Sequence, residues 1–65
     1  MKSFGSNLRY YRQLTKISQQ KLGELLGFSA RTVSDWECNN TEPDLKTLKN
    51  LAKILNVTID ELLDF

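Results

Sequence analysis

The segment Ala30–Glu37 carries the polar side chains whose types and spacing best suit recognition chemistry. At about 100° per residue, Arg31, Ser34 and Asp35 fall on the side of a helix opposite its large apolar residues. An arginine fork can bond two acceptors at once, such as O6 and N7 of guanine, and a carboxylate can accept from the amino group of cytosine. This polar face is therefore suited to hydrogen bonding with the edges of nucleic-acid bases.

The same face has a simpler interpretation. Arg31 and Asp35 are four residues apart and can pair on the helix surface, which stabilises a helix by about 0.2–0.5 kcal/mol. An arginine that precedes its carboxylate is the weaker orientation of such a pair. The sequence favours a base contact for Arg31 and leaves Asp35 open between a base contact and the ion pair. Ala30 and Ser34 are further candidates for contacts with base edges or a thymine methyl group.

A helix of this length is not stable alone in water, so Val33 and Trp36 must pack on other elements. Helical spacing of apolar residues occurs almost throughout the chain, and strand-like alternation is absent, which predicts an all-α fold. We expect five short helices. Their predicted inward residues are Phe4, Leu8, Tyr11 and Leu14, then Leu22, Leu25 and Leu26, then Val33 and Trp36, then Leu45, Leu48, Leu51, Ala52 and Leu55.

Helix boundaries are indicated by capping residues. A first helix is expected over 6–15, a second over 19–26 after Ser18, and a third over 30–37 after Ser29, because serine is a favoured N-cap. Gly27 and Asn39 suit the left-handed conformation that ends a helix. A fourth helix follows Pro43 and Asp44. The capping box of Thr58 and Glu61 opens a last helix that ends near Phe65.

The second and third helices are separated by a three-residue connection, Gly27–Ser29. So short a connection forces a steep crossing, and Gly23 offers a smooth spot where the neighbouring backbone can approach. This is the helix-turn-helix arrangement, in which the first helix lies across the DNA backbone and the second presents its outer face to the major groove. An ordinary helical hairpin of a small bundle is the alternative.

The length and the charge distribution of the chain limit the number of domains and the kind of partner it can have. The 65 residues predict a single domain, 1–65, that buries only about 60% of its unfolded surface. The net charge is +1, yet residues 1–36 carry six basic against two acidic side chains, and residues 37–65 carry three basic against six acidic. This asymmetry is compatible with one end facing a polyanion, and equally with two solvated halves.

The residues needed for several other functions are scarce. There is one cysteine and no histidine, which leaves no intramolecular disulfide and few ligands for a structural metal, so no metal or other cofactor is expected. No apolar run approaches the roughly 20 residues of a membrane span, and no signal peptide is evident. We therefore expect a cytoplasmic protein with no membrane or small-molecule partner.

The sequence resembles the phage Cro and repressor family (the XRE-like, Cro/C1-type proteins) of helix-turn-helix domains. The resemblance is carried by "LRYYR" (8–12), "SQQKLGELLGFSARTVSDWE" (18–37), Pro43 and "LKNLAKILNVTIDELL" (48–63). It implies a five-helix, lambda-repressor-like fold, sequence-specific binding to operator DNA, transcriptional repression and no catalytic activity. The chain departs from the family at Lys16 and Asn39, where glycine is usual.

The resemblance also implies roles for individual residues. Gln19 is expected to bond a phosphate and to brace side chains of the third helix, and Arg12 and Glu37 are expected to form a partly buried ion pair. Backbone amides at helix starts attract anions, so residues near them are candidates as well. The remaining predicted phosphate contacts are Ser18, Ser29 and Thr32, together with Asn39, Asn40 and Thr41 of the following loop.

The predicted function is that of a repressor that binds double-stranded operator DNA. Ile59, Leu62, Leu63 and Phe65 exceed what one short helix can bury, so a homodimer is expected, at least on DNA. Two alternatives keep the same fold: the antitoxin of a toxin–antitoxin pair, and a protein-interaction module. An enzyme is disfavoured, because the chain lacks histidine and a paired acidic cleft and is expected to have little volume for a pocket.

Overall fold

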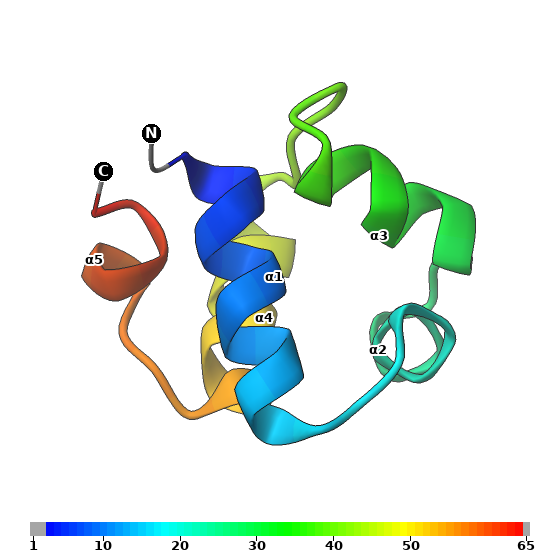
Figure 1. Cartoon of the computed structure of the whole chain (residues 1–65), viewed down its shortest axis with the longest axis horizontal. Coiled ribbons are helices and arrows are strands. Elements are labelled where there is room, and N and C mark those ends of the chain that lie inside the picture. The colour runs from blue at the N-terminus through cyan, green and yellow to red at the C-terminus, as the bar shows by residue number, and fades with distance from the viewer. Residues whose placement is uncertain (1–2, 65) are drawn as a thin grey trace.

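A computed structural model describes residues 3–64 of the chain. Over these residues it contains five α-helices and no strand, as predicted. In Figure 1, α1 runs through the centre with α4 behind it, α5 lies on one side, and α2 and α3 lie on the other. The helices are α1 (Phe4–Thr15), α2 (Gln19–Leu26), α3 (Ala30–Glu37), α4 (Leu45–Leu55) and α5 (Ile59–Leu62).

The boundaries of α2 and α3 are confirmed, and local capping explains them. Ser18 Oγ accepts from the backbone N–H of Lys21, and Ser29 Oγ accepts from that of Thr32. Gly27 ends α2 in the left-handed conformation, with φ of 83°. Asn39 also has a positive φ, 61°, just after α3. These contacts lie within a few residues of one another, which is why they could be predicted from sequence.

Two predicted boundaries were wrong. α1 begins at Phe4 and not at residue 6, because Ser3 and Ser6 form a capping box: Ser3 Oγ accepts from the N–H of Ser6 over 3.2 Å, and Ser6 Oγ accepts from the N–H of Ser3 over 2.8 Å. The last helix ends at Leu62, well before Phe65, which lies outside the described residues.

The core confirms the side on which α3 is packed. Val33 is fully buried and Trp36 nearly so, within a cluster to which all five helices contribute. Three predicted core residues are instead exposed: Leu14, Leu25 and Leu45. Leu45 is at the first position of α4, at the edge of the core. Leu14 points about 120° away from the buried Leu8 around the axis of α1, and so lies outside the buried side of that helix.

Leu25 is exposed because the buried side of α2 is centred on Leu22, Gly23 and Leu26, of which the two leucines were predicted to face inward. The buried side of α2 includes Gly23, as predicted, since a Cβ there would lie 2.7 Å from the backbone oxygen of Phe28. The chain entering α3 therefore packs directly on the backbone of α2. The ring of Phe28 then meets Trp36 edge-on at 5.2 Å between ring centroids. This close approach holds the helix pair together and leaves the opposite side of α3 free.

Candidate nucleic-acid interface

The four predicted base-reading residues share the outer side of α3. Their positions, Ala30, Arg31, Ser34 and Asp35, span about 140° around the helix at 100° per residue. Arg31 is the most exposed of them, and the other three are half-buried. The opposite side of α3, which carries Val33 and Trp36, is buried in the core. The structure thus presents one face with a cation, a hydroxyl, a carboxylate and a small apolar residue.

Arg31 and Asp35 contact each other on this face. Arg31 Nε lies 3.8 Å from Asp35 Oδ1, with the side chains 87% and 32% exposed. The distance is too long for a hydrogen bond, and an ion pair so open to water contributes little to stability. The ion pair between Arg31 and Asp35, which the sequence left open, is present in the unbound protein.

The predicted ion pair between Arg12 and Glu37 is present behind this face. Arg12 Nε donates to Glu37 Oε2 over 2.6 Å, and Nη2 donates to Oε1 over 3.3 Å. The two side chains are only 12% and 4% exposed. Arg12 Nη1 also donates to the backbone oxygen of Ile17 over 2.9 Å, so the same guanidinium holds the connection between α1 and α2.

Gln19 joins this network from α2. Its Nε2 donates to Glu37 Oε1 over 3.1 Å, which matches the bracing role that the family resemblance implies. One carboxylate at the end of α3 therefore receives hydrogen bonds from both α1 and α2. Because a fork on a carboxylate is geometrically demanding, this network restricts the angle at which α3 is docked.

A second connection between α1 and α3 was not predicted. The N-terminal turn of α1 packs on the backbone at the end of α3, where a Cβ on Gly5 would lie 2.7 Å from the backbone oxygen of Trp36 and closer still to that of Glu37. Asn39 Oδ1 accepts from the Gly5 N–H, and Asn39 Nδ2 donates to Ser3 Oγ, both over 3.0 Å. Gly5 lies outside the helix predicted over 6–15, so its sequence context did not indicate this packing.

The predicted phosphate contacts divide into two kinds. The amide of Asn39 is engaged with α1, so in this state it is not free for a phosphate. Asn40 and Thr41 are exposed in the loop after α3. The other candidates lie at helix starts, where Ser18 caps α2 and Ser29 both caps α3 and lies 3.1 Å from the hydroxyl of Thr32. The arrangement places neutral donors at the starts of α2 and α3 and in the loop after α3.

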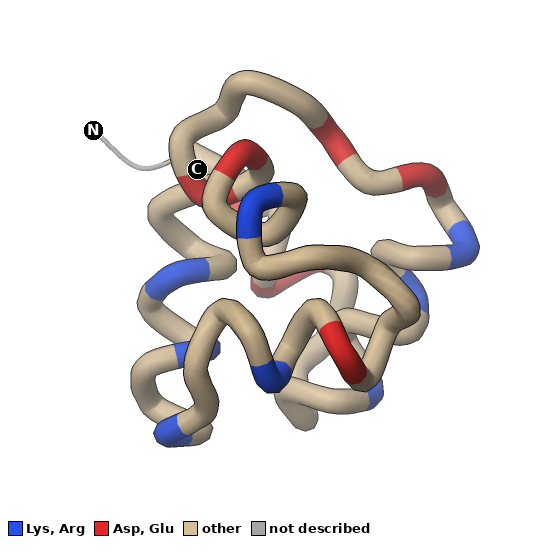
Figure 2. The backbone as a smooth tube through the Cα atoms, turned by 90° about the vertical axis from the view of Figure 1, so that its right-hand side faces the viewer, with Lys and Arg blue, Asp and Glu red and all other residues tan. Residues whose placement is uncertain are grey.

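Charge is mixed around α3. Figure 2 faces α2 and α3 toward the viewer, and both helices carry basic and acidic positions. The loop that leads from α3 to α4 adds two acidic residues, Glu42 and Asp44. Hydrogen bonds from Thr47 hold the pKa of Asp44 below its ordinary value, so this N-cap of α4 stays negative. A polyanion would therefore meet individually placed contacts here more than a continuous positive surface.

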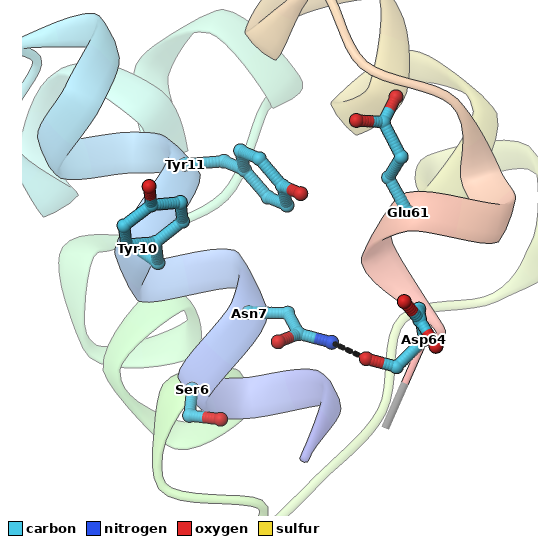
Figure 3. A pocket seen from close by; sticks show the side chains of 6 residues that line it. All are labelled: Ser6, Asn7, Tyr10, Tyr11, Glu61 and Asp64. Carbon is cyan, nitrogen blue, oxygen red and sulfur yellow. Dashed lines mark hydrogen bonds between the residues drawn. The ribbon is translucent and has the colours of Figure 1, made fainter. Parts of the chain in front are cut away.

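A groove between α1 and α5 corrects the expectation of little pocket volume. It measures about 500 Å³, and Figure 3 shows Tyr11 reaching from α1 toward the side on which Glu61 lies. Burial and the charges of Glu61 and Asp64 raise the pKa of Tyr11. The groove lies on the other side of α1 from α3 (Figure 1). Its lining residues are Ser6, Asn7, Tyr10, Tyr11, Glu61 and Asp64.

Asn7 also went unpredicted, since a buried polar residue has no periodic signal. It is buried in the floor of this groove, and its Nδ2 donates to the backbone oxygens of Leu62 and Asp64 over 3.1 and 2.9 Å. Across residues 3–64, no helix has the length and apolarity to cross a membrane. The same part of the chain contains no group of three or more metal-ligating side chains placed to hold an ion.

The arrangement of α2 and α3 matches known proteins. A sequence profile described as helix-turn-helix matches residues 8–62. The chain is 38% identical over 60 residues to YqaE, an uncharacterized HTH-type transcriptional regulator of Bacillus subtilis (strain 168), covering 92% of this chain and 52% of that protein. It is 40% identical over 60 residues to YonR, an SPbeta prophage-derived uncharacterized HTH-type transcriptional regulator of the same strain, covering 92% and 56%.

The chain thus spans about half the length of these two relatives. Among solved structures it is similar to the c2 repressor protein of Salmonella phage P22, determined in complex with a synthetic operator. The TM-score is 0.91 at 36% identity, over 98% of this chain and 97% of that one. The match includes the steeply crossed pair α2 and α3 and extends through α5. The chain belongs to the helix-turn-helix family.

Proposed function

We propose that the chain is a single DNA-binding domain of a cytoplasmic transcriptional repressor, without catalytic activity, and that it recognises its operator with the outer side of α3. The observation that carries this proposal is the exposed polar face of a helix whose inward side is fully packed. Its four candidate base contacts are Ala30, Arg31, Ser34 and Asp35. The solved P22 repressor, which this chain resembles over nearly its whole length, holds operator DNA.

In this proposal the neighbouring residues position the domain on the phosphates. Gln19 stands at the first position of α2, with one amide proton engaged by Glu37 and its oxygen free of any hydrogen bond within residues 3–64. The remaining phosphate contacts would come from Ser18, Ser29, Thr32, Asn40 and Thr41, and from Asn39 if its amide leaves α1. Such contacts fix the register of a protein on the duplex and carry no sequence information of their own.

Two copies are proposed to bind together on DNA. One domain of 65 residues covers few base pairs, whereas helix-turn-helix proteins commonly read two half-sites about one helical turn apart. Among the apolar residues predicted to contact a second copy, Leu62 is fully buried within the domain and Ile59 is half-buried, whereas Leu63 is exposed. Leu63 is therefore the described residue of that set best placed to meet a second copy.

The proposal predicts a salt-sensitive and sequence-selective complex. If about four phosphates are neutralised per subunit, the logarithm of the association constant falls with the logarithm of salt concentration at a slope near −3.6 per subunit. The measurement is fluorescence anisotropy on a duplex selected from a randomised library, with a scrambled duplex as the control. Equal, weak binding to both duplexes at every salt concentration would contradict the proposal.

A further inference from the structure

Asp35 occupies a position where a free carboxylate is unfavourable. It lies on the face that the proposed function turns toward DNA, so its charge would be repelled by the phosphates unless a cation or a base amino group compensates it. The structure already supplies the cation, because Arg31 Nε lies 3.8 Å from Asp35 Oδ1. The unbound chain therefore contains a compensated pair on its reading face.

We infer that Asp35 is a positioning residue that holds Arg31 by its Nε side and so directs the terminal nitrogens of the guanidinium at one guanine. This inference rests on the proposed function. The contact uses Nε, the inner nitrogen of the fork, and the Arg31 side chain is otherwise 87% exposed, so both terminal nitrogens remain open to a ligand. Guanine offers two acceptors, O6 and N7, on the edge that such a fork matches.

The pair contributes little to the unbound domain, since water screens it. Its effect would arise in the complex, because excluding water from the interface strengthens the attraction between the two charges. Arginine otherwise has many accessible rotamers, and Asp35 would restrict them once the interface has formed. Asp35 then acts through Arg31 in place of the direct base contact for which it is a candidate, and the two residues together specify one base pair and not two.

The experiment uses the chain itself and a duplex selected from a randomised library. In that duplex each guanine is replaced in turn by 7-deazaguanine, which lacks the N7 acceptor, and the position where binding falls most is assigned to Arg31. Wild-type affinity should fall about tenfold on this substitution. Asp35→Ala and Asp35→Asn should each relax the preference at this same position. Arg31→Lys should also weaken the preference although Asp35 is intact, because an ammonium lacks the planar fork whose inner nitrogen faces Asp35 and is not fixed in orientation by it.

The double variant separates the two roles of Asp35. If Asp35 acts through Arg31, adding Asp35→Ala to the Arg31→Ala variant causes no further loss of DNA affinity. The Asp35→Ala single variant should have the same melting temperature as the wild type. A loss that persists in that background and maps to a cytosine elsewhere in the site would overturn the inference. So would a selected site whose binding ignores 7-deazaguanine at every position. Failure of the wild type to select any sequence would instead overturn the proposed function itself.

Discussion

Replacing Glu37 by alanine is expected to lower the free energy of unfolding by about 3–5 kcal/mol, because the change leaves the Arg12 guanidinium buried without its partner. The pair is nearly enclosed, with the Glu37 side chain 4% exposed. Gln19 loses its hydrogen bond at the same time. Since a domain of this size has little stability to lose, the midpoint of a thermal melt should fall by more than about 10 °C.

Two kinds of variant control this experiment. Ser34→Ala, on the outer side of α3, should melt like the wild type and change only DNA binding, because Ser34 makes no side-chain hydrogen bond within residues 3–64. Arg12→Met and Glu37→Gln each remove one charge of the pair while keeping much of its bulk. If both of these melt near the wild-type midpoint, the ion pair does not anchor α3.

Gly5→Ala is expected to destabilise the domain by about 1–3 kcal/mol, the usual cost of overpacking. The added Cβ would collide with backbone oxygens of Trp36 and Glu37, which cannot move aside as a flexible side chain can. Helix propensity alone predicts the opposite sign, since alanine is favoured over glycine in a helix by about 0.5–1 kcal/mol. Urea denaturation followed by circular dichroism measures the difference.

Gln13→Ala is the matched control for Gly5→Ala. Gln13 is on an exposed part of the same helix, so its replacement should change stability by less than about 0.5 kcal/mol. A Gly5→Ala variant that is more stable than the wild type would show that α1 does not approach the end of α3 as closely as the structure indicates.

The parts of the fold that could be predicted from the sequence are those determined by local contacts. Ser18, Gly27 and Ser29 act within a few residues of themselves, so α2, its turn and α3 could be located. The pairing of Arg12 with Glu37 spans 25 residues, and the resemblance to a known family, not the spacing, predicted it.

The features that could not be predicted depend on contacts between residues far apart in the sequence. Periodicity indicates which side of a helix is apolar but not how wide the buried side is, and Leu25 was misplaced because Gly23 brings another backbone against α2. The bonds that tie Asn39 to Gly5 and Ser3 join residues 34 and 36 positions apart. No pattern within either segment indicates them. The groove beside Tyr11 has the same origin, since it depends on how α5 is packed on α1.

Contact between the outer side of α3 and DNA can be measured by titrating isotope-labelled protein with its selected duplex and following the backbone amide signals by NMR. We expect the largest changes at Ala30–Asp35 and at the start of α2 near Gln19, with small changes at Ser6 and Tyr10 in the groove between α1 and α5. Large changes confined to that groove, with the signals of α3 unaffected, would contradict DNA contact through α3.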